Sequence, residues 1–237
     1  PSHYRRIAPA PLENTQMELT TAVIRQALTL PNFDSQAAHY HMLPVDRRDR
    51  VRPSELPGQP RIGGVLLLLY SHQQTIHLVL TRRRDDLTSH AGQISFPGGR
   101  REPGETAVAA ALRETEEEIG VPATAVTILG ELTTIYIPPS DYEVHPFVGW
   151  VNGGKRPLFV PEVREVAEIL EVPLTHLLDP TTREIGPIPV RGAVYTVPYY
   201  SVNGHKVWGA TAILLSEFLA RVRETVDSKN RKVKSEK

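Results

Sequence analysis

Apolar residues occur along the chain in short runs and alternations, a pattern that predicts strands interspersed with helices. Strands are expected, in chain order, at Gly64–Tyr70, Thr75–Thr81, Val126–Tyr136, Val144–Val151 and Ala193–Val202. The last of these is expected to turn back across Asn203-Gly204, a strong hairpin signal, into Val207–Trp208. Val163–Leu170 fits either a short helix or a strand. The mixture predicts a protein of the α/β class.

Three segments have helical periodicity. Asn14–Leu30 predicts a helix that Pro31 ends, and Ala210–Val226 predicts an amphipathic helix near the end of the chain. Thr106–Ile119 predicts the third helix, with Thr106 as its N-cap and Gly120 after its last turn. Its expected core stripe comprises Val108, Leu112, Thr115 and Ile119.

These elements divide the chain into three parts. Residues 1–60 form an N-terminal extension that is partly helical and partly extended, with a proline-rich connector over 44–60. Residues 61–226 form the main domain, and residues 227–237 form a basic tail that is expected to be solvated and frayed. The extension is expected to pack on the domain or on the second copy in a homodimer.

Composition excludes several classes of function. Lys plus Arg and Asp plus Glu both number 27, so the chain lacks the basic excess expected of a nucleic-acid partner. The absence of cysteine excludes disulfides, cysteine-ligated metals and thiol catalysis. The longest apolar run, Val65–Tyr70, is too short to span a membrane, and Pro1–Leu12 contains no apolar core of a signal peptide. We therefore expect a cytoplasmic protein without a membrane partner.

Acidic residues cluster at the end of the helix expected over Thr106–Ile119. Glu114, Glu117 and Glu118 share one face, whereas Glu116 points to roughly the opposite side. Each like-charge pair destabilises a helix by about 0.2–0.5 kcal/mol, and negative charge in the last turn also opposes the helix dipole. Two interpretations remain open on this helix alone: a solvated acidic helix end, or a site for Mg²⁺ or Mn²⁺, which prefer carboxylate ligands.

A wider spacing pattern surrounds these carboxylates. Its fixed positions are Gly99, Glu105, Arg113, Glu114, Glu117, Glu118 and Gly120, followed by the aliphatic Val121. This pattern resembles the Nudix box, Gx5Ex7REUxEExGU, in which U is aliphatic. Thr115 is the one departure, at the first aliphatic position.

The resemblance implies an α/β/α sandwich with a mixed sheet and a loop–helix–loop motif, and hydrolysis of a diphosphate linked to another moiety. It implies that Glu114 and Glu118 are the main metal ligands, and that Glu117 binds metal or abstracts a proton. Gly98 and Gly99 are expected to let the backbone approach a metal or phosphate. Arg113 is expected to hold the carboxylates by pairing with Glu117 or Glu105.

The segment Leu78–Gly99, just before the box, resembles the motif of coenzyme A pyrophosphatases, LLTxR(S/A)x3Rx3Gx3FPGG. The matching positions are Leu80, Thr81, Arg83, Gly92, Phe96, Pro97, Gly98 and Gly99. Arg84 and Thr88 depart, because Ser or Ala and a second Arg are usual there. The segments around Glu165-Val166, Val172–Leu174 and Val207–Ala212 also resemble the family, so that the resemblance covers about residues 61–220.

The resemblance implies that coenzyme A or acyl-coenzyme A is hydrolysed to 4′-phosphopantetheine, or its acyl form, and 3′,5′-ADP. Arg83 is the first candidate for a substrate phosphate, whereas Arg82 and Arg84 are expected to pair with Asp85 and Asp86 in a solvated turn. Glu117 and Glu165 are the main candidates for the general base, followed by Glu162, Glu143 and Asp141.

Two other functions compete with this one. The first is a Nudix hydrolase for ADP-ribose or another nucleoside diphosphate derivative. The second belongs to a different class, a non-catalytic Nudix-fold module for ligand sensing or interaction, which residues 1–60 would suit because they could dock a partner. The intact box favours catalysis over the non-catalytic alternative.

Overall fold

The computed structural model describes residues 19–43, 58–88, 90–190 and 192–235. The centre of the fold is β1 (Arg61–His72), which pairs antiparallel with β2 (Thr75–Arg83) and parallel with β7 (Tyr142–Lys155). The remaining strands of this eight-stranded mixed sheet are β3 (Ile94–Ser95), β4 (Gly98–Arg100), β5 (Val126–Glu131), β6 (Ile135–Ile137) and β8 (Val166–Pro173). The mixed sheet expected from the sequence is confirmed.

A smaller antiparallel sheet has the order β11 (His205–Val207), β10 (Ala193–Val202), β9 (Arg183–Val190). The helices are α1 (Thr21–Leu28), α2 (Ser35–Tyr40), α3 (Ala107–Ile119), α4 (Leu174–Leu178) and α5 (Gly209–Ser235). Short 3-10 turns occur at Ala123–Ala125, Pro138–Ser140 and Pro180–Thr182. Among the described residues, no helix combines the length and the apolar character needed to cross a lipid bilayer.

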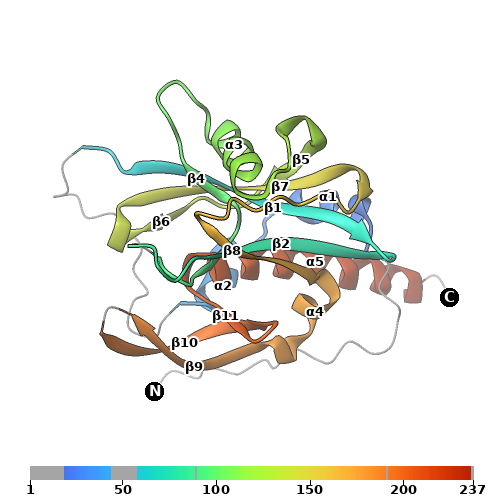
Figure 1. Cartoon of the computed structure of the whole chain (residues 1–237). Helices are drawn as coiled ribbons and strands as arrows, with labels where there is room; N and C mark the ends of the chain where they lie inside the picture. The colour runs from blue at the N-terminus through green and yellow to red at the C-terminus, as the bar shows by residue number, and fades with distance from the viewer. Residues whose placement is uncertain (1–18, 44–57, 89, 191, 236–237) are drawn as a thin grey trace, which may run out of the picture.

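Helices cover both faces of the main sheet, which explains the unbroken apolar run in β1. Leu66, Leu68 and Tyr70 pack with α3 on one face, because alternate side chains of a strand point to opposite sides. Leu67 and Leu69 belong to the larger core formed with α1 and α5 on the other face. Figure 1 shows the resulting layers, with α3 above the sheet and α5 below it. The α/β/α sandwich is therefore confirmed.

Helix α3 begins and ends where the sequence predicts. The Thr106 hydroxyl accepts a hydrogen bond from Ala109 N at 3.2 Å, and Gly120 takes a left-handed conformation with φ 73°. The helix lies so close to β1 that a Cβ on Gly64 would be 2.0 Å from Ala107 O. Its buried stripe, however, comprises Ala110, Ala111, Thr115, Glu118 and Ile119. Val108 and Leu112 of the expected stripe are half-buried and pack against the same core, so the buried face includes the expected stripe and extends beyond it.

Several element boundaries differ from those expected. The strand expected over Val126–Tyr136 is divided into β5 and β6, which both pair with β7. The helix-or-strand alternative at Val163–Leu170 is decided in favour of a strand, β8. Helix α5 continues to Ser235, through most of the basic segment that was expected to fray. The helix expected from Asn14 begins at Thr21 within the described residues, and 44–57 of the expected connector lie outside them.

The described part of the N-terminal extension, residues 19–43, packs on the domain of the same chain. Ile24 and Met42 are fully buried in the core that contains α5. Glu217 of α5, also fully buried, accepts hydrogen bonds from Ser35 Oγ at 3.1 Å and from the backbone N of Thr133 at 3.2 Å. Its carboxylate also contacts His39 Nε2 at 2.7 Å and Arg221 Nε at 3.0 Å. One carboxylate thus joins the extension, the β5–β6 connection and the closing helix.

We predict that Glu217→Ala lowers the free energy of unfolding by about 3–5 kcal/mol, because it leaves buried donors and cations without their acceptor. Denaturant titration of the purified protein measures this change. Glu224→Ala is the control, because Glu224 is exposed on the same helix and its loss should change stability by less than about 0.5 kcal/mol. Equal effects of the two substitutions would contradict the structural role of Glu217.

The same comparison has an expected pH dependence. Although burial alone would raise the pKa of Glu217, its contacts with His39, Arg221 and Thr133 lower the pKa to about 2 from 4.5. A carboxylate with a lowered folded-state pKa stabilises the protein above its unfolded pKa, and this contribution is lost as the pH falls towards the folded pKa. The stability difference between wild type and Glu217→Ala should therefore shrink between about pH 4.5 and pH 2.

Candidate active site

A single guanidinium, that of Arg113, organises the acidic end of α3. Its Nε and Nη2 donate to both carboxylate oxygens of Glu105, at 3.0 and 3.2 Å. Its Nη1 donates to Glu114 at 3.0 Å and to Glu117 at 3.2 Å, while Nη2 also donates to the carbonyl of Arg100 at 3.1 Å. The two pairings considered for Arg113 in the sequence are both present, and Glu114 is a third. The carboxylates are therefore held together by one countercharge.

Glu118 is the most deeply placed acid of the group. Its side chain is buried, and its carboxylate accepts a hydrogen bond from the backbone N of Gly98, at 3.4 Å. Burial, followed by the charge of Glu114, raises the pKa of Glu118 to about 8. Burial also raises the pKa of Glu114, although Arg113 opposes this shift. Burial thus favours the neutral form of both Glu114 and Glu118. A cation bound beside these two carboxylates would stabilise their charged form.

Glycines allow the backbone to lie against these acids. A Cβ on Gly99 would lie 2.4 Å from the carboxylate carbon of Glu114, so no larger residue fits there without moving the acid. Gly98 has φ 146°, and a Cβ on it would lie 2.3 Å from Gly64 O. The short strand β4 thus reaches the acids of α3 only because both of its first two positions are glycine.

The connection before β8 brings Glu165 to the end of α3. Val160 N donates to Ile119 O and Glu162 N donates to Glu118 O, both at 2.9 Å, so this segment satisfies the last carbonyls of the helix. Glu165 follows directly, with its carboxylate 3.6 Å from Arg83 Nη1. Its charge contributes to the raised pKa of both Glu114 and Glu118. Glu165, which is distant from the box in sequence, therefore faces the same acidic cluster.

The three consecutive arginines at the end of β2 have different partners. Arg82 donates to Asp85 at 2.9 Å and Arg84 donates to Asp86 at 2.6 Å, as expected from the sequence. Arg83 points to the opposite face of the strand, where its charge lowers the pKa of Glu118. Its Nε is buried without a hydrogen-bond partner among the described residues. Arg83 is thus the arginine of the three that is directed at the acidic cluster.

The remaining candidates for the general base have local partners. Glu143 contacts His145 Nε2 at 2.8 Å, and Asp141 accepts a hydrogen bond from Tyr136 at 2.9 Å. Glu162 accepts one from Arg164 N at 3.0 Å. Glu116 accepts one from Ala123 N at 3.2 Å, on a different side of α3 from the acidic cluster. These contacts leave Glu117 and Glu165 as the acids most closely joined to Glu114, Glu118, Arg113 and Arg83.

Some parts of the site were not recognised from the sequence. The carbonyl of Arg100 accepts from Arg113, and the backbone of residues 160–162 caps α3. Main-chain groups carry no residue-type signal, so their roles depend on how the loops fold. Gly64 also supports the site, because its lack of a side chain allows α3 to pack closely against β1. A glycine within an apolar strand was the sequence signal for this close approach.

The donor set fits a divalent cation. Glu114 and Glu118 supply carboxylate oxygens beside glycine backbone, which is the ligand chemistry that Mg²⁺ and Mn²⁺ prefer. Across the described parts of the chain, however, no three acidic or histidine side chains converge as a complete ligand set. Glu117 is 58% exposed and paired with Arg113, which explains why the third acid does not join the other two. Glu114 and Glu118 therefore form the core of the predicted metal site.

Comparisons with known proteins agree with this arrangement. The family model for the NUDIX domain matches residues 60–188. The chain is 36% identical to the Nudix hydrolase NudL of Photorhabdus laumondii over 172 residues, which cover 72% of this chain and 90% of that protein. It is 31% identical to NudL of Yersinia pestis over 209 residues, which cover 88% and 96% of the two chains.

Among solved structures, the Nudix hydrolase RenU of M. smegmatis is similar with a TM-score of 0.48 and 17% identity, over 72% of this chain and 88% of that one. The family model alone covers more than half of this chain, and it includes the acids of α3 and the Arg83–Glu165 pair. The chain therefore belongs to the Nudix family, as a hydrolase that acts on a diphosphate substrate.

Proposed function

We propose that this Nudix hydrolase cleaves the diphosphate of coenzyme A or acyl-coenzyme A. The products would be 4′-phosphopantetheine, or its acyl form, and 3′,5′-ADP. The observation that carries the proposal is the position of Arg83, the arginine of the upstream motif, which faces Glu118 and lies 3.6 Å from Glu165. A cation at this point suits a phosphate that is bound next to the metal-binding acids.

The neighbouring sequence supports the same substrate. Phe96 and Gly98 of the FPGG segment lead from β3 into the glycine pair that touches the acids, and Phe96 is buried as part of the core. The Thr211 hydroxyl, in the downstream segment that resembles the family, donates to Ile94 O at 3.0 Å. Both segments thus support the same strand–loop connection that leads to Gly98 and Gly99.

The reaction is the displacement of one phosphate by water. The oxygen of water adds to one phosphorus, the anhydride P–O bond on that phosphorus breaks, and the leaving phosphate takes the electron pair. Nudix hydrolases generally use divalent metal ions, and Mg²⁺ or Mn²⁺ bound by Glu114 and Glu118 would polarise the diphosphate and make water more acidic. Arg83 binds the diphosphate and offsets its negative charge.

Glu165 is the general base in this proposal. Its side chain is 51% exposed and so is accessible to water, and Arg83 holds it at the site. Glu117 is the alternative base, but Arg113 donates to both of its oxygens. The roles of Arg113 and Glu105 are to orient the acids, because the guanidinium joins Glu105 to Glu114 and Glu117.

We predict that Glu114→Gln and Glu118→Gln each remove most of the turnover while the protein remains folded. Each substitution removes a proposed metal ligand, and each also relieves repulsion between acids on one helix face. Initial rates at saturating Mg²⁺, together with the metal-free melting temperature, measure the two effects. Near-normal activity of either variant would show that the ligand assignment is wrong.

Glu116→Gln is the matched control on the same helix. The Glu116 carboxylate accepts a hydrogen bond from Ala123 N, away from the acidic cluster. The turnover of the Glu116→Gln variant should therefore stay within about twofold of wild type. A loss as large as that of Glu114→Gln would contradict the division of α3 into a catalytic and a structural side.

The substrate assignment predicts that coenzyme A has a higher kcat/KM than ADP-ribose or a dinucleotide. A panel of diphosphates, assayed with Mg²⁺ and with Mn²⁺ and resolved by chromatography, measures this order. A clear preference for ADP-ribose or a dinucleotide would overturn the coenzyme A proposal and leave the general Nudix activity in place.

Arg83→Ala is predicted to lower kcat/KM roughly ten- to a hundredfold, since a charge-assisted hydrogen bond contributes about 1.5–3 kcal/mol. Because Arg83 is directed at the acidic cluster, the same loss is expected with coenzyme A and with 3′-dephospho-coenzyme A. If the loss disappears with the dephosphorylated substrate, Arg83 binds the 3′-phosphate instead of the diphosphate.

A further inference from the structure

The turn that carries Glu165 is a compact unit at the start of β8. Glu165 N and Val166 N both donate to Glu162 O, at 2.9 and 2.8 Å, and the Glu162 side chain accepts from Arg164 N at 3.0 Å. These bonds determine the internal shape of the turn at 162–165. They do not by themselves determine where the turn lies relative to Arg83, which belongs to β2.

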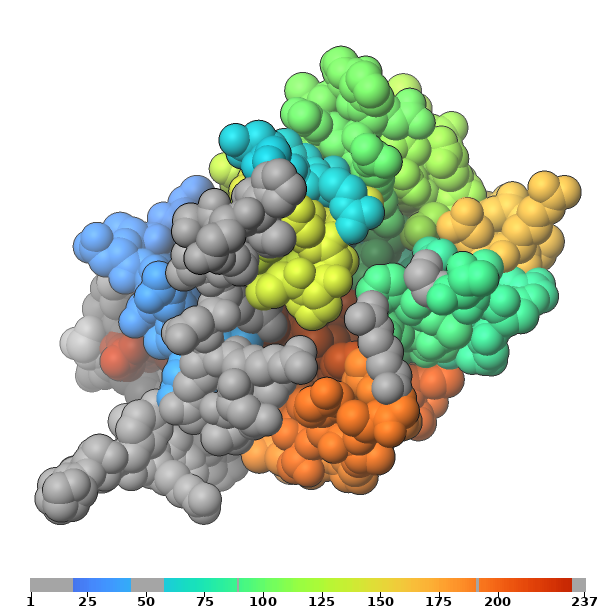
Figure 2. Space-filling view, turned by 90° about the vertical axis from the view of Figure 1, so that its left-hand side faces the viewer, coloured from blue at the N-terminus to red at the C-terminus, as the bar shows by residue number. Residues whose placement is uncertain are grey.

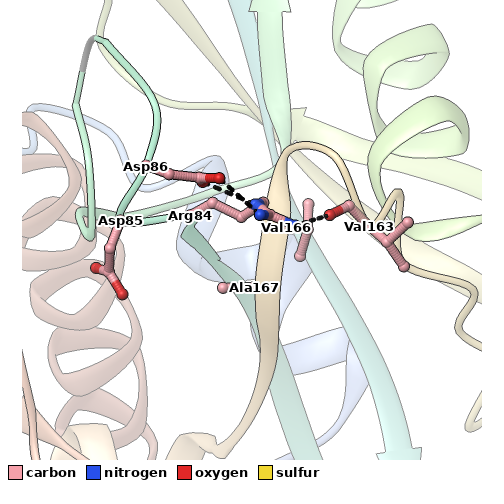
Figure 3. Close-up of a pocket in the computed structure, with 6 residues that line it drawn as sticks. All are labelled: Arg84, Asp85, Asp86, Val163, Val166 and Ala167. Carbon is pink, nitrogen blue, oxygen red and sulfur yellow. Dashed lines mark hydrogen bonds and ion pairs between the residues drawn. The ribbon is translucent and has the colours of Figure 1, made fainter.

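Arg84 connects this turn to β2. Its Nη1 donates to Val163 O at 2.8 Å, and its backbone N donates to Glu165 O at 3.0 Å. Its Nε and Nη2 donate to both oxygens of Asp86, at 2.8 and 2.6 Å, which holds the guanidinium in one orientation. Figure 3 shows Arg84 between Asp86 on one side and Val163 on the other.

The strand pairing at this point is irregular. Arg82 pairs with Glu168 whereas Arg83 pairs with Val166, so Ala167 is an extra residue that bulges from β8. A bulge bends a strand and redirects the side chains near it. Beyond this irregularity the backbone of Arg84 still bonds to Glu165 O, and the Arg84 guanidinium adds a second contact, to Val163 O, that ties the turn to the end of β2.

We propose that Arg84 is a positioning residue for the reaction. Its guanidinium fixes the turn 162–165 against the end of β2 and thereby places Glu165 beside Arg83; the catalytic consequence rests on the proposed function of Glu165. Ser or Ala, which the upstream motif usually has at this position, cannot span Asp86 and Val163 O. This chain thus has a constraint that the usual residue would not supply.

The Arg84 guanidinium already has three protein acceptors in this arrangement. Hydrogen bonds to Asp86 and to Val163 O engage Nε, Nη1 and Nη2. Its side chain also borders an open hollow of about 510 Å³ that is lined by Arg84, Asp85, Asp86, Val163, Val166 and Ala167. Figure 2 shows this region on the right-hand side, where the gold segment before β8 lies next to the teal loop after β2. Because the guanidinium lies at this open surface, its removal creates no cavity in the core.

The first test measures the position of the turn without turnover. Amide hydrogen exchange in the metal-free protein should become about tenfold faster over residues 162–166 in Arg84→Ala, while the peptides of α3 stay as protected as in wild type. Arg84→Lys should give an intermediate increase, because an ammonium cannot reproduce the fork that joins Asp86 to Val163 O. Unchanged exchange over 162–166 in Arg84→Ala would overturn the proposal.

The second test is a double-mutant cycle with Glu165→Gln on the same substrate. Arg84→Ala alone should lower kcat on the order of tenfold, with KM within about twofold, because it displaces a base and not a substrate ligand. In the Glu165→Gln background the same substitution should have almost no further effect, since Arg84 acts through Glu165. Losses that multiply independently in the double variant would also overturn the proposal.

Arg156→Ala is the matched control. Arg156 makes a forked ion pair with Glu171 at 2.6 and 2.7 Å and is 42% exposed, the same fraction as Arg84, but it lies at the other end of the β7–β8 connection. Its turnover should stay within about twofold of wild type. If wild type hydrolyses no diphosphate in the panel, the proposed function fails, and the exchange measurement still decides whether Arg84 positions the turn.

Discussion

The site depends on the way in which Arg113 holds carboxylates that would otherwise repel one another. Its guanidinium joins Glu105 of the preceding loop to Glu114 and Glu117 of α3, and it also binds the carbonyl of Arg100. Glu118 lies beyond its reach and is buried, which raises its pKa to about 8. Arg113 therefore connects the loop, the helix and β4. Glu118, which accepts no hydrogen bond from Arg113, is the acid best suited to bind a metal.

The second organising feature is the alternation of side chains along β2. Arg82, in β2, pairs with Asp85, and Arg84, just after the strand, pairs with Asp86, whereas the charge of Arg83 acts on Glu118 of α3. Three adjacent residues of one type thus have different tasks: Arg83 meets the acidic cluster, and Arg84 holds the turn that carries Glu165. A net charge of zero for the whole chain is consistent with this local use of charge, because the arginines act on particular carboxylates.

The described part of the N-terminal extension belongs to the domain. Glu217 bonds to Ser35 and His39 of the extension and to Thr133 of the sheet, and Arg221 provides a countercharge on the same helix. Residues 19–43 therefore complete the core on the face opposite to the site. Their packing on the chain's own domain was one of the two arrangements that the sequence left open.

The sequence by itself determined the features that depend on local spacing. The strands β1, β2 and β10, the ends of α3 and the grouping of its acids follow from periodicity, capping and the box pattern, because each is set by residues close in the chain. Tertiary structure decided what depends on distant segments: the division of the expected strand into β5 and β6 along β7, and the approach of Glu165 to Arg83. The close approach of α3 to Gly64 also buries Ala111, which lies outside the expected stripe. Such contacts arise from burial and long-range backbone hydrogen bonds, and those depend on how the whole chain folds.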